Sequence, residues 1–173
     1  STNYNNASFI LTGAGSLIYA NIYQRWRNGF NNLTVGQAGQ ITSASTIFAV
    51  FNDLTVGSGA LAGSASIYLR KFGSPLNLNP NATISINELR FFGSNQTIPP
   101  LPNGYDCNIR ISARNLTVTQ TGNVTLNQGN SLLMDGDTFA NRSLTYNTNG
   151  FDLNVGGNLI LGAGGDTALK TLD

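Results

Sequence analysis

A seven-residue phrase occurs twice in this sequence, and its spacing constrains the fold more than any other feature. The phrase reads Phe-Asn-Asn-Leu-Thr-Val-Gly at residues 30–36 and Phe-Asn-Asp-Leu-Thr-Val-Gly at residues 51–57, 21 residues later. Looser copies follow at residues 114–118 and 150–156. A short apolar-polar-apolar strand that recurs at a fixed period near 20 residues is typical of a stacked solenoid. The repeat therefore predicts an elongated, repetitive architecture.

Within one period the sequence predicts several short strands separated by turns. Residues 116–118, 123–126 and 131–134 alternate apolar and polar side chains, and Gly122 and Gly129 lie in the turns between them. Such alternation places one face of each strand in a core and the other in water. Three short strands in each turn of about 21 residues predict an all-β fold, a right-handed parallel β-helix. An antiparallel β-sandwich of the jelly-roll kind is the alternative.

The central leucines of the repeats give the expected order of the turns. Leu11, Leu33 and Leu54 are 22 and 21 residues apart, and Leu116 follows after a further 62 residues, which is close to three periods. We expect the next copies at residues 131–134 and 153–155. The whole chain, 1–173, is expected to be a single domain with an irregular or inserted region near 70–106, which includes a Pro-rich stretch at 97–104. Residues 16–29 fit either an amphipathic helix or a strand.

Asparagine recurs beside the Leu-Thr-Val strand, at Asn32, Asn52 and Asn115. Stacked amide side chains of successive turns can hydrogen-bond along the axis of a solenoid. Asparagine is also favoured in turns, because its side chain bonds to nearby backbone groups. The sequence leaves both interpretations open.

The charge content narrows the class of function. Nine of the 173 residues are Lys or Arg and eight are Asp or Glu, so that the net charge is +1 and only 10% of the chain is charged. This balance argues against nucleic acid and anionic membranes as partners, and no apolar run is long enough for a transmembrane segment. An average soluble domain has about a quarter charged residues. We therefore expect an extracellular or cell-surface protein, and the strand-like ends suit a segment of a longer array.

The residues available for chemistry are few, because histidine is absent and with it the commonest general base and metal ligand. Asp135 and Asp137 form a close acidic pair that fits a turn, the beginning of a calcium site, or the acid and base of a glycosidase. Trp26 lies between two arginines and fits either packing on the solenoid or stacking against a sugar. Cys107 is expected to be a small buried hydrophobe, with a reactive or interchain thiol as the alternative. We predict no catalytic residue and no cofactor other than possible calcium.

The Leu-Thr-Val strands, together with the phrase Gly-Phe-Asp-Leu-Asn-Val-Gly-Gly-Asn-Leu at residues 150–159, resemble the repeats of secreted bacterial surface proteins. These are the right-handed β-helix proteins of the filamentous-haemagglutinin and autotransporter-passenger kind. The resemblance covers most of the chain from Phe30 onward and is weakest between Arg70 and Asp106. It implies an extracellular fold used for adhesion, display or building surface fibres, and it brings no catalytic residues.

These observations predict a non-catalytic, extracellular structural or adhesive protein. Self-association through exposed strand edges would let it stack into a filament, and glycans or neighbouring cell surfaces are further candidate partners. A polysaccharide-binding or polysaccharide-degrading β-helix, either a lyase or hydrolase or a phage-fibre module, is the alternative. Seven Asn-x-Ser/Thr sequons are candidate glycosylation sites: Asn6, Asn32, Asn81, Asn95, Asn115, Asn123 and Asn141.

Overall fold

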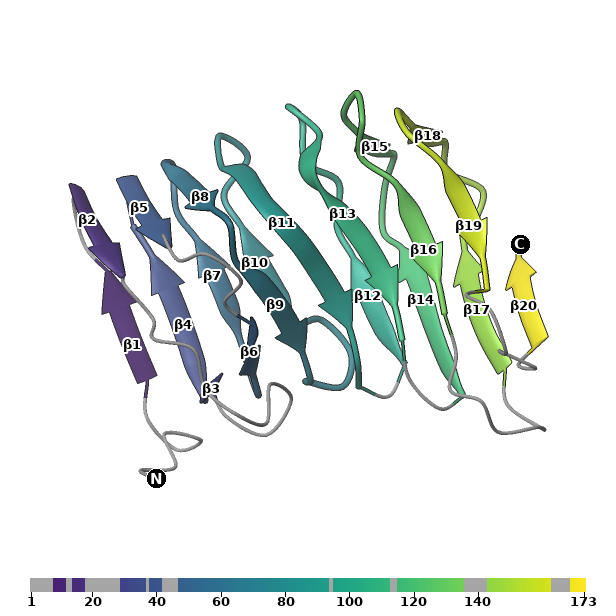
Figure 1. Ribbon diagram of the computed structural model, residues 1–173, viewed down its shortest axis with the longest axis horizontal. Coiled ribbons are helices and arrows are strands. Elements are labelled where there is room, and N and C mark those ends of the chain that lie inside the picture. The colour runs from purple at the N-terminus through teal and green to yellow at the C-terminus, as the bar shows by residue number, and fades with distance from the viewer. Residues whose placement is uncertain are drawn as a thin grey trace.

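The chain is an all-β solenoid built from parallel strands (Figure 1). The computed structural model describes residues 8–11, 14–17, 29–36, 38–41, 47–93, 95–112, 115–135, 143–162 and 169–173. Every strand pairing among them is parallel, and none of them is helical. The predicted β-helix is confirmed, and the antiparallel sandwich is wrong for this part of the chain.

One wall of the solenoid consists of two four-stranded sheets in succession. Each turn contributes one strand to this wall, and the strands run in the same direction (Figure 1). The first sheet contains β1 (Ser8–Leu11), β4 (Asn32–Val35), β7 (Leu54–Val56) and β10 (Leu76–Leu78), and the second contains β12 (Gln96–Ile98), β14 (Leu116–Gln120), β17 (Ser143–Asn147) and β20 (Leu169–Leu172).

The rest of the described strands form one twelve-stranded sheet, to which most turns contribute two short strands or one long one. The long strands are β11 (Thr83–Phe91) and β13 (Tyr105–Ile111). The short strands are β2 (Ala14–Leu17), β3 (Gly29–Phe30), β5 (Ala38–Ile41), β6 (Ile47–Val50), β8 (Ala60–Gly63), β9 (Ser66–Leu69), β15 (Val124–Leu126), β16 (Leu132–Met134), β18 (Leu153–Val155) and β19 (Leu159–Leu161).

The core lies between the walls and is filled by aligned columns of apolar side chains. Leu33 pairs with Leu54 and Leu54 with Leu76, at spacings of 21 and 22 residues. These three leucines are buried, and the intervening outward positions are polar. Alternation of period two therefore separates core from surface in each strand, as the repeated phrase predicted.

The sequence predicted the wrong register at both ends of this wall. Leu33 pairs with Phe9, whereas Leu11 pairs with Val35. Past Leu116 the next leucine on the wall is Leu144, 28 residues later. Residues 131–134 and 153–155, which were expected there, contribute β16 and β18 to the other sheet. The apolar-polar-apolar pattern is the same on both walls, so the pattern alone does not tell which wall a strand joins.

The stretch from residue 70 to 106 contains the break between the two sheets of the first wall. There a single bridge, Gly73 to Gln96, replaces a strand ladder between β10 and β12. Gln96 is buried and its amide donates to the carbonyls of Leu69 and Lys71 at 3.0 and 2.8 Å. The Pro-rich stretch connects β12 to β13. Most of the 16–29 segment, for which helix or strand was open, lies outside the described residues.

Candidate functional site

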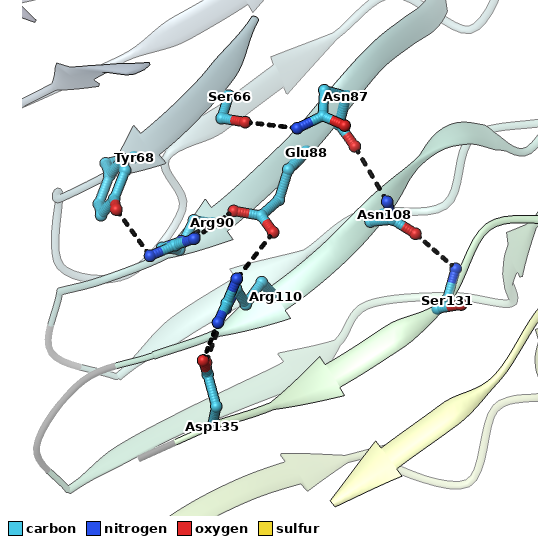
Figure 2. Close-up of polar contacts among 9 residues, drawn as sticks. All are labelled: Ser66, Tyr68, Asn87, Glu88, Arg90, Asn108, Arg110, Ser131 and Asp135. Carbon is cyan, nitrogen blue, oxygen red and sulfur yellow. Dashed lines mark hydrogen bonds and ion pairs between the residues drawn. The ribbon is translucent and has the colours of Figure 1, made fainter. Parts of the chain in front are cut away.

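A column of polar side chains runs along the outside of the twelve-stranded sheet and connects successive turns. The amide of Asn87 donates to the Ser66 hydroxyl at 2.8 Å, and the amide of Asn108 donates to the Asn87 carbonyl at 3.3 Å. The Asn108 Oδ1 then accepts the Ser131 N–H at 2.9 Å, and the Ser131 hydroxyl accepts the Asn158 N–H at 3.0 Å. Figure 2 shows this ladder from Ser66 to Ser131. Because each bond joins adjacent turns, the column fastens the solenoid along its axis.

Asparagine side chains on the first wall also form hydrogen bonds between successive turns. Asn32 accepts the side-chain amide of Asn52 at 2.9 Å, which is a direct amide-to-amide step between turns. Asn115 accepts the Ser143 N–H at 3.1 Å. Turn chemistry occurs as well, since the side chain of Asn79 accepts the N–H of Asn81 at 2.9 Å. Stacking of amides between turns is therefore confirmed for Asn32 and Asn52, whereas the turn bond occurs at Asn79, outside these repeats.

The sequons fall into three groups in the structure. Asn32, Asn95, Asn115 and Asn123 each accept a backbone N–H from the following turn through their side-chain oxygen. Asn81 is exposed in the turn before β11. Asn6 and Asn141 lie outside the described residues.

Asp135 is part of an ion-pair cluster on the outer face of the twelve-stranded sheet (Figure 2). Its carboxylate accepts from both Nε and Nη2 of Arg110, the former at 2.8 Å. This contact raises the pKa of the Arg110 guanidinium. The other two weak ligand candidates, Trp26 and Asp137, lie outside the described residues. The structure thus places Asp135 in a side-chain contact between turns and does not show its predicted acidic neighbour.

Glu88 lies at the centre of this cluster and is almost completely buried. Its Oε1 contacts Arg90 Nη2 at 2.7 Å, and its Oε2 contacts Arg110 Nη1 at 3.5 Å. Arg90 in turn donates to the Tyr68 hydroxyl at 2.6 Å. Two carboxylates and two guanidiniums balance each other, and together with Tyr68 they reach across four turns. Such an arrangement holds backbone segments together and leaves no charge imbalance for an ionic ligand.

A second stack of side chains borders the ion pairs. The Arg70 guanidinium carbon lies 5.5 Å from the ring centroid of Phe51 and 5.4 Å from that of Phe92, which places the cation between two rings. Burial lowers the pKa of Arg70. Tyr68 contacts Phe92 edge-to-face, with centroids 5.4 Å apart. Cation–aromatic contacts of this kind add to the adhesion between turns.

The sequence patterns did not indicate that Tyr68, Glu88, Arg90 and Arg110 belong to one cluster. The available signal was spacing: Tyr68, Arg90 and Arg110 are 22 and 20 residues apart, and the strand registers align them in one column. A search for polar residues at the solenoid period would have found the column. The ion pairs themselves depend on side-chain geometry that the period does not specify.

The outer face of the first wall is a flat array of hydroxyl and amide side chains. Thr34, Thr55 and Asn77 align in one column. Thr117, Thr145 and Thr171 align in another, and Thr97 pairs with Thr119 beside it. We call this surface the Thr/Asn face. Its side chains are partly or fully exposed, so hydrogen-bonding groups repeat about every 4.8 Å along the rod.

The C-terminal turn, comprising β18, β19 and β20, differs from the turns before it. Leu159 and Leu161 pair with the buried Leu132 and Met134 but are themselves 45% and 51% exposed. Lys170 pairs with Leu144 and so continues the column of the buried Leu116 and Leu144 with a charged residue. Within the described chain each of these three strands has a partner on one side only.

The described residues contain no group of three or more acidic or cysteine side chains arranged to hold a metal ion. Cys107 is free and fully buried in the core, and burial raises the pKa of its thiol. This placement fits its interpretation as a small hydrophobe. Nor does this part of the chain include a helix suited to crossing a membrane. No protein-family model, curated protein or solved structure matches the chain.

Proposed function

We propose that this chain is a non-catalytic structural or adhesive module that forms a stiff rod at a cell surface or outside the cell. The observation that carries the proposal is the continuity of contacts between turns. Backbone ladders, the Ser66–Asn158 polar column and the Glu88 cluster all run along one axis. Stiffness follows, because bending the rod would separate several kinds of contact at once.

Low charge supports the extracellular part of the proposal. The exposed face of the first wall relies on Thr and Asn for its polarity, and the acidic side chains of the Glu88 cluster are engaged with arginines. A glycan-cleaving enzyme needs an acid and a base that are free to exchange protons. The Thr/Asn face instead offers a repeated set of neutral donors and acceptors for adhesion to glycans or a neighbouring surface.

Self-association is the second part of the proposal, with another copy of the chain as the partner. The strands of the C-terminal turn have unpaired edges in the described chain and exposed leucines above the core. At the other end of the rod, β1 pairs only with β4 among the described strands, and Ile10 is exposed. Both ends carry parallel strands that run in the same direction, so head-to-tail contact would extend the ladder. A heterologous contact that does not close produces a filament.

Electron microscopy and sedimentation of the purified chain test self-association. We expect filaments or concentration-dependent oligomers, and their loss in Leu161→Asp, which places a carboxylate in the exposed part of the core. Thr117→Asp, on the Thr/Asn face, is the matched control and should assemble normally. A strictly monomeric wild-type chain at high concentration would contradict the filament.

Surface location and the absence of catalysis need separate measurements. Antibodies against the chain should label intact source cells or the fibres outside them, and labelling only after permeabilisation would overturn the location. Incubation with pectic and other acidic glycans should give no new reducing or unsaturated ends. Appearance of such ends would favour the enzyme alternative. Glycan binding without cleavage that Thr117→Asp weakens would identify the Thr/Asn face as the adhesive surface.

A further inference from the structure

We propose that Asn149 is a site of spontaneous deamidation, in which the backbone nitrogen of Gly150 converts the Asn149 side-chain amide into a carboxylate. The inference goes beyond the structural role proposed above and does not rest on it. Three Asn-Gly pairs occur in the sequence, at residues 28–29, 103–104 and 149–150. Asn28 lies outside the described residues. The other two pairs have opposite environments, and this contrast carries the proposal.

The reaction needs only water and a weak base. The Gly150 nitrogen loses its proton to base and attacks Cγ of Asn149, forming an N–Cγ bond. The Cγ–Nδ2 bond then breaks and ammonia leaves, so that a five-membered cyclic imide joins the two residues. Water opens this ring at either carbonyl and yields aspartate or isoaspartate. Glycine favours the attack because it has no side chain to hinder the approach and allows a wide range of backbone angles.

At Asn149 the attacking group is the Gly150 nitrogen, and it lies in a turn that is exposed to solvent. The pair forms the middle of a turn between β17 and β18, closed by a 3.0 Å bond from the Phe151 N–H to the Thr148 carbonyl. Both residues are exposed and have positive φ, 53° and 78°. A Cβ built on Gly150 would meet no atom within 4 Å. The structure records no hydrogen bond from the Gly150 nitrogen within the described chain, so the nucleophile has no partner to leave.

The leaving amide of Asn149 is also weakly held. Its Nδ2 donates to the Gln120 carbonyl at 3.5 Å, a distance at which a hydrogen bond contributes little. Rotation of the side chain toward the Gly150 nitrogen therefore breaks one long contact. Apart from its two chain neighbours, nothing lies within 4 Å of the place that a Cβ would take on Gly150.

At Asn103 the same two residue types are protected. The Gly104 N–H donates to the Leu101 carbonyl at 2.8 Å, so the nucleophile is engaged. Gly104 is buried, and a Cβ built there would lie 2.2 Å from the Asn127 Oδ1. The amide of Asn127 also donates to the Asn103 carbonyl at 3.2 Å. Attack at this position must first open a packed, hydrogen-bonded turn.

Deamidation at Asn149 would alter the C-terminal turn. The new carboxylate would face the Gln120 carbonyl that the amide now contacts, which places two acceptors together. Isoaspartate would also add a methylene to the backbone shortly before β18. We therefore expect the modified turn to exchange its backbone hydrogens faster than the unmodified one.

The test compares the two sites in one sample. The folded chain is kept in mildly alkaline buffer, and peptide mapping by mass spectrometry follows aspartate and isoaspartate at both positions over time. The same chain in concentrated urea gives the rates without structure, where both sites should react at similar rates. In the folded chain we expect Asn149 to react at least about ten-fold faster than Asn103, because the Gly104 nitrogen must first give up its hydrogen bond to Leu101 and the Gly150 nitrogen has none to give up in the described chain.

Two results would overturn the proposal: an intact Asn149 after a time in which the urea sample has reacted, or equal rates at both sites in the folded chain. Asn149→Gln should remove the modified peptide, since the longer side chain forms the imide ring slowly, and should leave Asn103 unchanged. If that variant folds poorly, the ratio of rates in the wild-type chain decides the question alone.

Discussion

The central turns and the C-terminal turn have the same strand pattern but different surroundings. Leu132 in β16 is 1% exposed, whereas Leu159 in β19, its direct partner in the ladder, is 45% exposed. The strands do not differ in alternation or in residue type at these positions. Their difference shows that a leucine in a solenoid is buried by the turns on both sides of it. Stability in such a fold is therefore a property of interfaces between neighbours.

The largest effect that distinguishes these regions should come from shortening the two paired leucines. Leu132→Ala removes a buried side chain and leaves a cavity, so we expect it to lower the free energy of unfolding by about 2–5 kcal/mol. Leu159→Ala should cost less, about 1 kcal/mol, because 45% of the residue is already exposed. Urea unfolding followed by circular dichroism measures both. Equal losses would mean that the C-terminal turn is covered in solution.

Removing charge from the Glu88 cluster should have the next largest effect. Glu88→Gln leaves Arg90 and Arg110 without their shared carboxylate in a largely buried place, which should cost about 2–3 kcal/mol. Asp53→Asn is the matched control, since Asp53 pairs with Lys71 at 2.6 Å where both side chains are partly exposed. That variant should lose less than about 1 kcal/mol. A small effect at Glu88 would show that solvent screens the cluster.

High pH should destabilise the central turns through their buried acids. Burial raises the pKa values of Cys107, Tyr105 and Tyr146 in the folded chain. These groups therefore contribute fully to the free energy of unfolding below the pKa values that they have in the unfolded chain. That contribution is lost as pH rises above those values. We expect the free energy of unfolding to fall by about 1.4 kcal/mol per pH unit above about pH 8.5 from Cys107, and more steeply above about pH 10 as the tyrosines join.

Cys107→Ala separates these contributions. Urea titrations between pH 8 and 11 should show that the variant lacks the first decline and keeps the second. A wild-type stability that is flat across this range would mean that the three groups are accessible to water in the folded chain.

The smallest difference should come from the polar surface. Asn108→Ala leaves the Ser131 N–H and the Asn87 carbonyl without their side-chain partner, at a cost of about 1 kcal/mol. Asn154, on β18 in the C-terminal turn, is exposed and has no side-chain hydrogen bond to the described residues, so Asn154→Ala should change stability by less than about 0.5 kcal/mol. Hydrogen exchange of the Ser131 amide is the direct measurement. Unchanged protection in Asn108→Ala would remove the polar column as a source of stability.

Sequence alone predicted the period, the parallel β-helix and the core leucines of the clearest repeats. It could do so because alternation and spacing are local properties that Leu33 and Leu54 share. It failed to place the strands after Leu116, since β16 and β17 show the same alternation on different walls. Of the candidate site it indicated Asp135 and the asparagines of the first wall, Asn32, Asn52 and Asn115, but not the asparagines of the polar column. It did not give the Glu88 cluster, whose members meet only after the register is fixed and a bulge between Ser85 and Glu88 has shifted β11.

Lys170 continues a column of buried leucines with a charged residue, and it limits which strands can pair with the outer edge of β20. Any strand that pairs with the outer edge of β20 must set a side chain beside Lys170 and leave the existing contacts of its ammonium intact, because burying a charged group is costly unless its contacts are kept. A strand that leaves room for the Lys170 ammonium at the edge would match better than one that covers it. Charged edge positions of this kind prevent indiscriminate pairing. Association at this end should therefore depend on salt concentration, even though the exposed leucines Leu161, Leu169 and Leu172 lie in the same turn.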